Sequence, residues 1–319
     1  MNNALKDGLI RAMKDKMPGG NNLASALTEI LCIGKEAVYR RLRGEVAFTF
    51  NEAAAISREL GISLDKIIGN SSPGSTVFDL NLPEMTDSLN NYYGILTRYL
   101  NFFRHIKTDP QSTVCTASNI IPFTFYSPYE NISKFRLCRW AYQNHHLQRS
   151  SSLSEMDVPQ KIIDTHIQLS KEIRQVPNTD FILDNTLFSS LVNEIKYFSG
   201  LNLISAKDTG NLKAEIHAML NEMECMSISG SFNNGNKLQI YLSNINFEAT
   251  YSYIERRDFQ ICLFRVYSIN SMDSQNSKIC NIQKDWIQFL KRHSTLVSQS
   301  GEMQRIMFFN QQRNMVDSI

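Results

Sequence analysis

The sequence contains no uninterrupted apolar run of the roughly 18 residues that a membrane-spanning helix needs. Its N-terminal segment, MNNALKDGLIRAMKDKM, interrupts the apolar residues with a charge every two or three positions, so it lacks the core of a secretory signal peptide. We therefore expect a soluble protein of the cytoplasm that has no membrane partner.

The spacings of cysteine and histidine that are typical of zinc sites and disulfide frameworks are also missing. The six cysteines are scattered, and most lie among apolar residues, as is usual for reduced and packed thiols. They are Cys32, Cys115, Cys138, Cys225, Cys262 and Cys280. This distribution favours a reducing compartment and predicts no metal site.

Recognisable catalytic motifs are missing as well. The sequence has no GxSxG, no Walker phosphate loop, no GxGxxG and no HExxH. His293 lies beside Ser294, with Ser300 and Glu302 downstream, but we interpret the last two as ordinary residues of a helix N-terminus. We expect no enzymatic activity and no cofactor.

The chain has little net charge for a nucleic-acid-binding protein. The formal charge is only +2 over 319 residues. The length and a hydrophobic fraction of 42% predict two or three globular domains. Bulk charge cannot attract DNA here, and binding would depend on a local cluster of cations.

Residues 35–43 contain such a cluster, because Lys35, Arg40, Arg41 and Arg43 fall within nine positions. Apolar residues around it recur at helical spacing, and a short turn at Gly34 separates two of these helices, as in a helix-turn-helix. The predicted helices are 4–17, 22–31, 35–42, 50–60 and 63–68.

The order of particular residues in this region is distinctive. It comprises Leu23-Ala24, Ile33-Gly34, Val38, Arg43-Gly44 and the sequence LGISLDKII at positions 60–68. The pattern resembles the DNA-binding domain of lambda-repressor and Cro-type transcription regulators, and it covers about residues 1–70 only. The resemblance implies an all-α domain of five helices whose third helix enters the major groove. The family usually opens its second helix with glutamine, which is replaced here by Asn21 or Asn22, and Asn22 is our candidate for the DNA contact.

Within the third helix the residue types suggest two roles. Lys35, Glu36, Tyr39 and Arg40 could meet base edges, whereas Arg41 and Arg43 would bind phosphates. A different interpretation is that these cations only solvate a surface helix, and that Glu36 pairs with Arg40 one turn later.

After a linker at residues 71–84, the sequence predicts a helical dimerisation or connector region at 85–180 and an α+β region at 181–319. Residues 85–107 form a long helix with two interleaved seven-residue series. Its apolar stripe comprises Met85, Leu89, Tyr92, Leu96, Tyr99 and Phe103. We interpret the stripe as a dimer seam or as the face that packs the helix on its own domain.

Near residues 226–269 the period of the apolar residues changes to that of strands. The segments 226–232, 238–243, 247–254 and 259–269 are joined by short polar connections, which predicts a four-stranded antiparallel meander within a helix-rich α+β region. Residues 259–264 are apolar on both faces, so we expect helices to cover that strand.

These observations favour a sequence-specific transcriptional regulator that binds double-stranded DNA as a homodimer in a bacterial or phage-type cytosol, associated with the nucleoid. The C-terminal region would serve dimerisation and the sensing of an unidentified small-molecule effector. Two other classes remain: a protein-interaction scaffold built on the helix-turn-helix, and an enzyme with an appended DNA-binding module.

Overall fold

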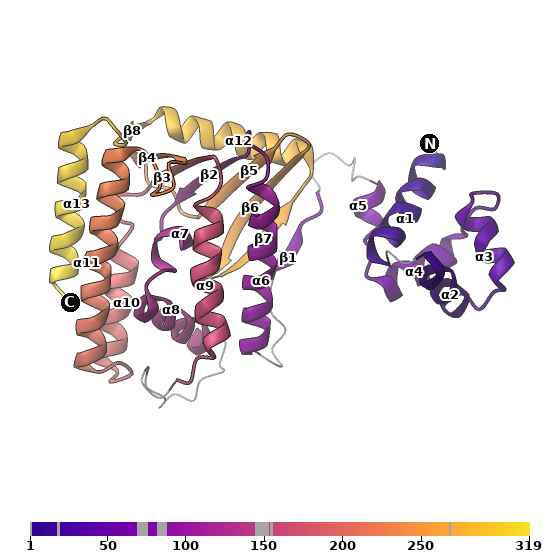
Figure 1. Cartoon of the computed structure of the whole chain (residues 1–319), viewed down its shortest axis with the longest axis horizontal. Helices are drawn as coiled ribbons and strands as arrows, with labels where there is room; N and C mark the ends of the chain where they lie inside the picture. The colour runs from indigo at the N-terminus through magenta and orange to yellow at the C-terminus, as the bar shows by residue number, and fades with distance from the viewer. Residues whose placement is uncertain are drawn as a thin grey trace. The chain divides into compact units, whose positions relative to one another are not determined.

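The chain forms two compact units, Met1–Val77 and Phe78–Ile319, in a computed structural model (Figure 1). The structure describes residues 2–17, 20–68, 76–81, 88–143, 153, 156–267 and 269–319. None of the helices in these ranges is both long enough and apolar enough to cross a membrane.

The first unit is helical over its described residues. It contains α1 (Asn2–Lys16), α2 (Gly20–Leu31), α3 (Lys35–Leu42), α4 (Phe50–Leu60) and α5 (Leu64–Ile68). Their apolar faces meet in one core because each helix carries its apolar residues three or four positions apart. The buried side chains of that core are Leu9, Met13, Leu23, Ala24, Leu27, Val38, Ile56 and Ile62.

Local signals set the ends of α4. The hydroxyl of Thr49 accepts a hydrogen bond from the backbone of Glu52 at 3.2 Å, and the Glu52 carboxylate accepts one from the backbone of Thr49 at 2.8 Å. This capping box fixes the first turn. Gly61 ends the helix in the left-handed conformation, with φ of 60°, which glycine adopts without steric cost.

The second unit is organised around one eight-stranded mixed sheet, in the order β1-β7-β6-β5-β2-β3-β4-β8. The three neighbours β2, β3 and β4 run parallel, and the other pairs are antiparallel. The strands are β1 (Asp79–Asn81), β2 (Thr113–Ser118), β3 (Asn178–Leu183), β4 (Lys237–Ser243), β5 (Tyr251–Arg256), β6 (Phe259–Tyr267), β7 (Asn270–Ser274) and β8 (Ser294–Leu296).

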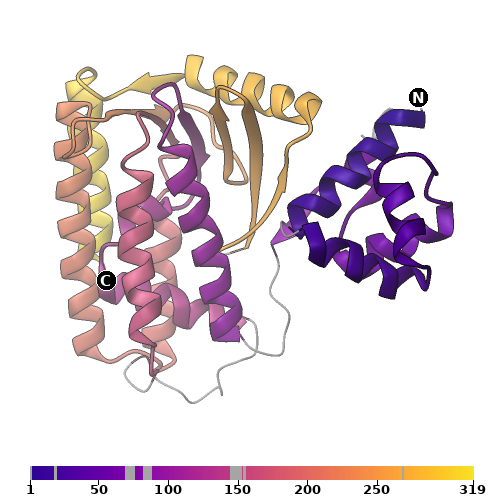
Figure 2. The ribbon, with the colours of Figure 1, turned by 45° about the vertical axis from the view of Figure 1, so that its right-hand side comes forward.

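Helices cover both faces of this sheet (Figure 2). One face packs on α12 (Ser277–Arg292), and Cys115 and Ile182 point toward it. The neighbouring residues Val114 and Phe181 point to the opposite face, because successive side chains of a strand alternate. On that side the sheet shares one hydrophobic core with α6 (Ser88–Ile106), α7 (Phe123–Tyr126), α8 (Glu130–Gln143), α9 (Gln160–Ile173), α10 (Ser189–Gly200), α11 (Ala206–Ser229) and α13 (Glu302–Asp317).

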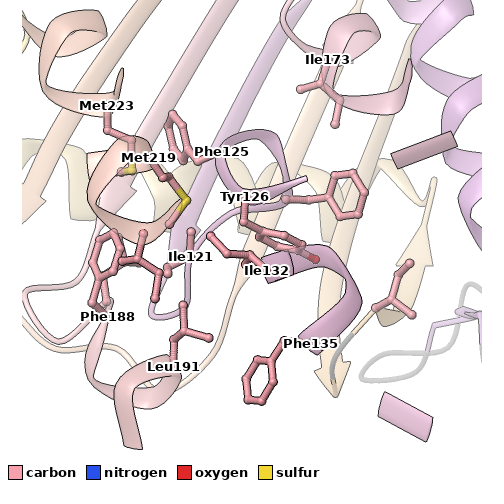
Figure 3. Close-up of a cluster of buried hydrophobic side chains, with 14 of the residues drawn as sticks. Ile121, Phe125, Tyr126, Ile132, Phe135, Ile173, Phe188, Leu191, Met219 and Met223 are labelled. Carbon is pink, nitrogen blue, oxygen red and sulfur yellow. The ribbon is translucent and has the colours of Figure 1, made fainter. Parts of the chain in front are cut away.

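The larger core lies between the sheet and this second group of helices. Figure 3 shows part of it, where Phe125 of α7, Ile132 of α8, Leu191 of α10 and Met219 of α11 come together. All four are at most 2% exposed. Helices far apart in sequence therefore share one core, which explains why residues 78–319 behave as a single unit.

The predicted fold class, a five-helix all-α domain joined to a region with a four-stranded antiparallel meander, is wrong. The sheet has eight strands of mixed direction. Residues 226–229 belong to α11, and β2 and β3 lie between β4 and β5, so segments 238–243 and 247–254 are not neighbours. Short strands that are buried on both faces have no polar alternation, and periodicity alone does not separate them from helix.

The sheet also crosses the domain boundaries expected from sequence. The proposed division at residues 180 and 181 falls inside β3. Within the expected linker 71–84, the described residues include β1, which pairs with β7 through Leu80 and Met272. Residues 71–75 and 82–84 lie outside the described ranges.

The stripe on α6 faces the interior of its own unit. Tyr92 and Leu96 are 2% and 0% exposed, Phe103 is 9% exposed, and Leu89 and Tyr99 pack against the same core. Figures 1 and 2 show α6 beside α9, which it contacts. Of the two interpretations of the stripe, the structure shows the packing of the helix on its own domain, because the apolar surface of these residues is already covered within the unit. Met85 lies outside the described residues.

Candidate nucleic-acid interface

The fold of the first unit anchors α3 by one side and exposes the other. Val38 is fully buried between neighbouring helices. The preceding turn contains Cys32 in a left-handed conformation, with φ of 52°, and Gly34 as the extended N-cap of α3. This short connection keeps α2 and α3 in contact. A helix-turn-helix arrangement of this kind can present its second helix to a groove of DNA.

The outer side of α3 carries four of the residues expected to meet base edges. All four are exposed: Lys35, Glu36, Tyr39 and Arg40. Even the aromatic side chain of Tyr39 is 38% exposed. Arg40 makes one long ion pair, 3.6 Å from its Nε to a carboxylate oxygen of Glu45. Because both partners are about half exposed, water and salt weaken this pair, and the guanidinium can exchange it for another anion.

Arg41, which the sequence predicts as a phosphate contact, has a different environment and is already bound within its own unit. Its guanidinium donates two hydrogen bonds to the carboxylate of Glu52, at 3.1 and 2.8 Å, and a third to the carbonyl of Ala37 at 3.2 Å. The two charged side chains are only 15% and 16% exposed. A bidentate pair this enclosed holds α3 against the N-terminus of α4.

Glu52 therefore serves two purposes. Burial alone would raise the pKa of its carboxyl, but hydrogen bonds from Arg41 and from Thr49 outweigh that effect and lower the pKa. The same carboxylate closes the capping box of α4 and binds the guanidinium on α3. This one side chain therefore links α3 to the first turn of α4.

Arg43 lies at the C-cap of α3 and is exposed. It donates hydrogen bonds to Glu45 at 2.6 Å and to Glu36 at 3.2 Å, and these bonds raise its pKa. Hydrogen bonding to Arg43 lowers the pKa of Glu45. Glu36 thus pairs with Arg43 rather than with the expected Arg40. Since these carboxylates are exposed, a phosphate can compete for Arg43.

Cations from α1 meet the end of α3 in a groove that sequence reasoning missed. The groove has a volume of about 390 Å³ and is lined by Lys6, Asp7, Ile10, Arg11, Lys14, Leu42, Arg43 and Gly44. Four of these side chains are cationic and one is anionic. Arg11 and Lys14 lie three positions apart on α1, a spacing that places them on one side of a helix. In the sequence, this spacing was the sign that the two cations belong to one surface.

Gly44 shapes one wall of this groove. Its φ is 80°, and a Cβ built there would lie 2.7 Å from Nζ of Lys6. The glycine therefore permits both the left-handed turn after α3 and the close approach of the Lys6 ammonium group.

The charge balance is uneven between the two units. Residues 1–77 contain ten Lys and Arg against eight Asp and Glu, so this unit carries the whole formal charge of +2. At least four of its carboxylates, those of Glu36, Glu45, Glu52 and Glu59, are paired with arginines of the same unit. Among the side chains that the structure describes in this unit, Lys6, Arg11, Lys14 and Lys35 form no ion pair within the unit.

Asn22 lies in the first turn of α2, and its side chain is not among those described. No group of three or more His, Cys, Asp or Glu side chains that could hold a metal ion occurs in the described part of the chain. The six cysteines are free thiols.

The chain matches no protein-family model, and it shows no significant similarity to curated proteins or to solved structures. The resemblance to lambda-repressor and Cro-type regulators therefore rests on the residue pattern of the first unit alone.

Proposed function

We propose that this protein is a sequence-specific transcriptional regulator of the cytoplasm that binds double-stranded DNA through its first unit. The observation that carries the proposal is the exposed side of α3, where Lys35, Tyr39 and Arg40 project from a helix anchored by buried Val38. The cationic groove between α1 and the end of α3 supports it, because it extends the positive surface beyond the helix.

The mechanism places α3 in the major groove. Lys35, Tyr39 and Arg40 meet base edges or the phosphates beside them, and Glu36 stays paired with Arg43 or accepts a hydrogen bond from cytosine. Arg43 and the groove cations Lys6, Arg11 and Lys14 bind the phosphate backbone. Release of counterions from the DNA then provides much of the affinity.

A single unit with a formal charge of +2 supplies few phosphate contacts, so one copy binds weakly. We propose that the protein acts as a homodimer that reads two half-sites about one turn of DNA apart. The dimer contact lies outside the buried stripe of α6. Light scattering of the full chain across a concentration series tests the dimer directly.

The binding test begins by selecting bound sequences from a random duplex library with the full chain. Fluorescence polarisation of the selected duplex is then measured from 50 to 300 mM salt. We expect Arg40→Ala to weaken binding by about 1–3 kcal/mol per half-site. The triple variant Lys6→Ala, Arg11→Ala, Lys14→Ala should make the plot of log affinity against log salt shallower by about one unit per lost phosphate contact, with little change in the selected sequence.

Arg58→Ala is the matched control. Arg58 is an exposed arginine of the same unit that lines neither the groove nor the outer side of α3, so its loss removes the same charge without removing a proposed contact. If no sequence is enriched and polarisation does not depend on salt, the first unit is not a DNA-binding module. A partner protein captured by α3 under those conditions would favour the scaffold class instead.

A further inference from the structure

The last helix, α13, carries apolar side chains on two opposite sides. Phe308 and Phe309 belong to the core and are 4% and 0% exposed. Met303 and Met307 lie on the outer side and are 70% and 65% exposed, and Ile306 is 44% exposed. A helix that is apolar all round is normally covered on all sides. The second unit covers the inner side of α13 and leaves these three outer side chains in solvent.

The exposed apolar surface continues onto α11. The side chain of Gln299, just before α13, donates a hydrogen bond to the carbonyl of Ser229, the last residue of α11, at 2.8 Å. The end of α11 therefore lies beside the start of α13, and Figures 1 and 2 both show the two helices side by side. Ile228, which is 54% exposed, and the exposed Cys225 lie at the same end of this pair as Met303.

We call the exposed side chains of α13 together with Cys225 and Ile228 the α11–α13 face. No charged side chain is exposed on α13 from residue 303 to residue 314, a stretch that the structure describes in full. Arg305 is buried, and Arg313 is half-buried and donates a hydrogen bond to Glu224 of α11. Besides the three apolar residues, the exposed side chains of this stretch are the amides Gln304, Asn310, Gln311 and Asn314.

Charged groups are confined to the two ends of the face. At one end Glu302 is exposed. At the other end Lys213 and His217 of α11 lie 3.6 and 3.1 Å from the carboxylate of Asp317. The middle of the face therefore offers nothing to a strongly acidic or basic partner, whose recognition depends on opposite charge.

A surface of this composition is complementary to itself. In a two-fold dimer the same patch of both copies meets, so a patch rich in one sign of charge would repel its own copy. Amides both donate and accept, so Gln304, Gln311 and Asn314 can pair with the same groups of a second copy. The flexible thioethers of Met303 and Met307 adapt to one another in the same way.

The charges at the ends of the face favour an antiparallel arrangement of the two copies. In that arrangement Glu302 of one copy approaches the end of the face that carries Lys213 in the other copy. The opposite, parallel arrangement would bring the two Glu302 carboxylates together, which costs free energy because like charges repel.

The area of the face suits a dimer. The 16 residues of α13 rise about 24 Å, and α11 beside it extends the face to a width of about 20 Å. Each copy thus offers about 500 Å², and two copies together would bury about 1,000 Å², which is the lower limit for a specific interface.

We infer that the α11–α13 face is the dimer interface of this protein and that it packs against the same face of a second copy in antiparallel orientation. Two α11–α13 pairs then form a layer of four helices. The assignment rests on the proposed function, in which two copies of the chain read two half-sites.

The test is sedimentation velocity of the full chain without DNA, from about 1 to about 100 µM. The double variant Met303→Glu, Met307→Glu should raise the dissociation constant of the dimer at least 30-fold, because both copies bring negative charge into an apolar contact. Met303→Lys, Met307→Lys should do the same. An equimolar mixture of the Glu and Lys variants should form the dimer again, with a dissociation constant within tenfold of the original.

The matched control is Asn281→Glu, Ile282→Glu on α12. Both residues are exposed, and Ile282 is 57% exposed, so this variant adds the same two charges to an outer helix elsewhere in the unit. Its dissociation constant should stay within threefold of the original. If the charged variants do not fold, as judged by far-ultraviolet circular dichroism, oxidation of Met303 and Met307 by hydrogen peroxide in the original protein decides. Mass spectrometry should show oxidation at least fivefold slower at the higher concentration, because the dimer covers both thioethers.

An original protein that is monomeric at about 100 µM, or a Met303→Glu, Met307→Glu variant that dimerises within threefold of the original, would overturn the inference. Oxidation that does not depend on concentration would overturn it as well. The two proposals fail separately: a monomer that still binds the selected duplex retains the DNA-binding function, and a dimer through this face that binds no DNA refutes that function alone.

Discussion

Replacing Arg41 by alanine should loosen α3 from α4 rather than remove a contact to DNA. The substitution deletes two hydrogen bonds to Glu52 and one to the carbonyl of Ala37. It also leaves the Glu52 carboxylate, which is 16% exposed, without its counter-charge. Breaking one side of an enclosed ion pair costs about 3–5 kcal/mol when the pair is fully buried. Partial exposure and the remaining hydrogen bonds from Thr49 reduce the expected loss to about 2–3 kcal/mol.

Hydrogen exchange of the full chain measures this loss locally. In peptides from α3 and α4, a loss of about 2–3 kcal/mol corresponds to amide exchange roughly 30- to 150-fold faster. Arg40→Ala is the matched control, because Arg40 is the adjacent arginine and its pair with Glu45 is about half exposed. We expect it to change exchange in the same peptides by less than threefold.

The double variant Arg41→Met, Glu52→Gln separates the ion pair from the packing of the side chains. Because both charges are removed together, it should be more stable than the sum of the two single losses predicts. Exchange of α3 and α4 in Arg41→Ala within twofold of the original protein would refute the structural role of this pair.

Other predictions concern pH, the core and packing. Because the pKa of Glu52 is lowered, its contribution to stability is present above the ordinary pKa of 4.5 and is lost as pH falls through the lowered pKa. The difference in thermal stability between the original protein and Arg41→Ala should therefore shrink toward pH 3. Burial, and then the charge of Arg136, lower the pKa of His166 to about 3, so between pH 6.5 and 3 the unfolded chain binds a proton that the folded chain does not. Tryptophan fluorescence reports unfolding of the second unit, because Trp140 and Trp286 both lie there. The free energy of unfolding should fall by about 2 kcal/mol from pH 7 to pH 5, and His166→Gln should remove this fall. The same pH dependence in the variant as in the original protein would contradict the assignment to His166. Leu96→Ala should lower the free energy of unfolding by about 3 kcal/mol in the same assay, because Leu96 is fully buried. The molar mass from light scattering should not change. If the variant folds stably but an oligomer dissociates, α6 would be the dimer seam after all.

Local periodicity was sufficient to place several elements. Residues 35–42 and 50–60 carry apolar side chains at helical spacing, with Gly34 before one helix and Gly61 after the other, and these signals lie within a few positions of the structure they specify. The signal for the strand at 238–243 was equally local, because apolar residues alternate along it and it follows an Asn-Gly turn. The positions of lysine and arginine also indicated that cations concentrate at residues 35–43.

Long-range contacts decided the rest. Thr113–Ser118 and Asn178–Leu183 become adjacent parallel strands only because helical segments between them return the chain to the same sheet, and no short-range pattern records that pairing. The seven-residue series of α6 fits a dimer seam and an internal helix equally well, and only the packing on α9 and the sheet distinguishes them.

The same distinction applies to the candidate interface. The order of the residues is enough to bring Lys35, Arg40, Arg41 and Arg43 close together on one short helix and its C-cap. Their partners depend on the packing of the helices: Arg41 is held by Glu52, Arg43 pairs with Glu36 and Glu45, and Lys6, Arg11 and Lys14 join Arg43 in one groove. A charge acts according to the distance and solvent exposure of its partners, and these depend on how helices pack rather than on their order in the chain.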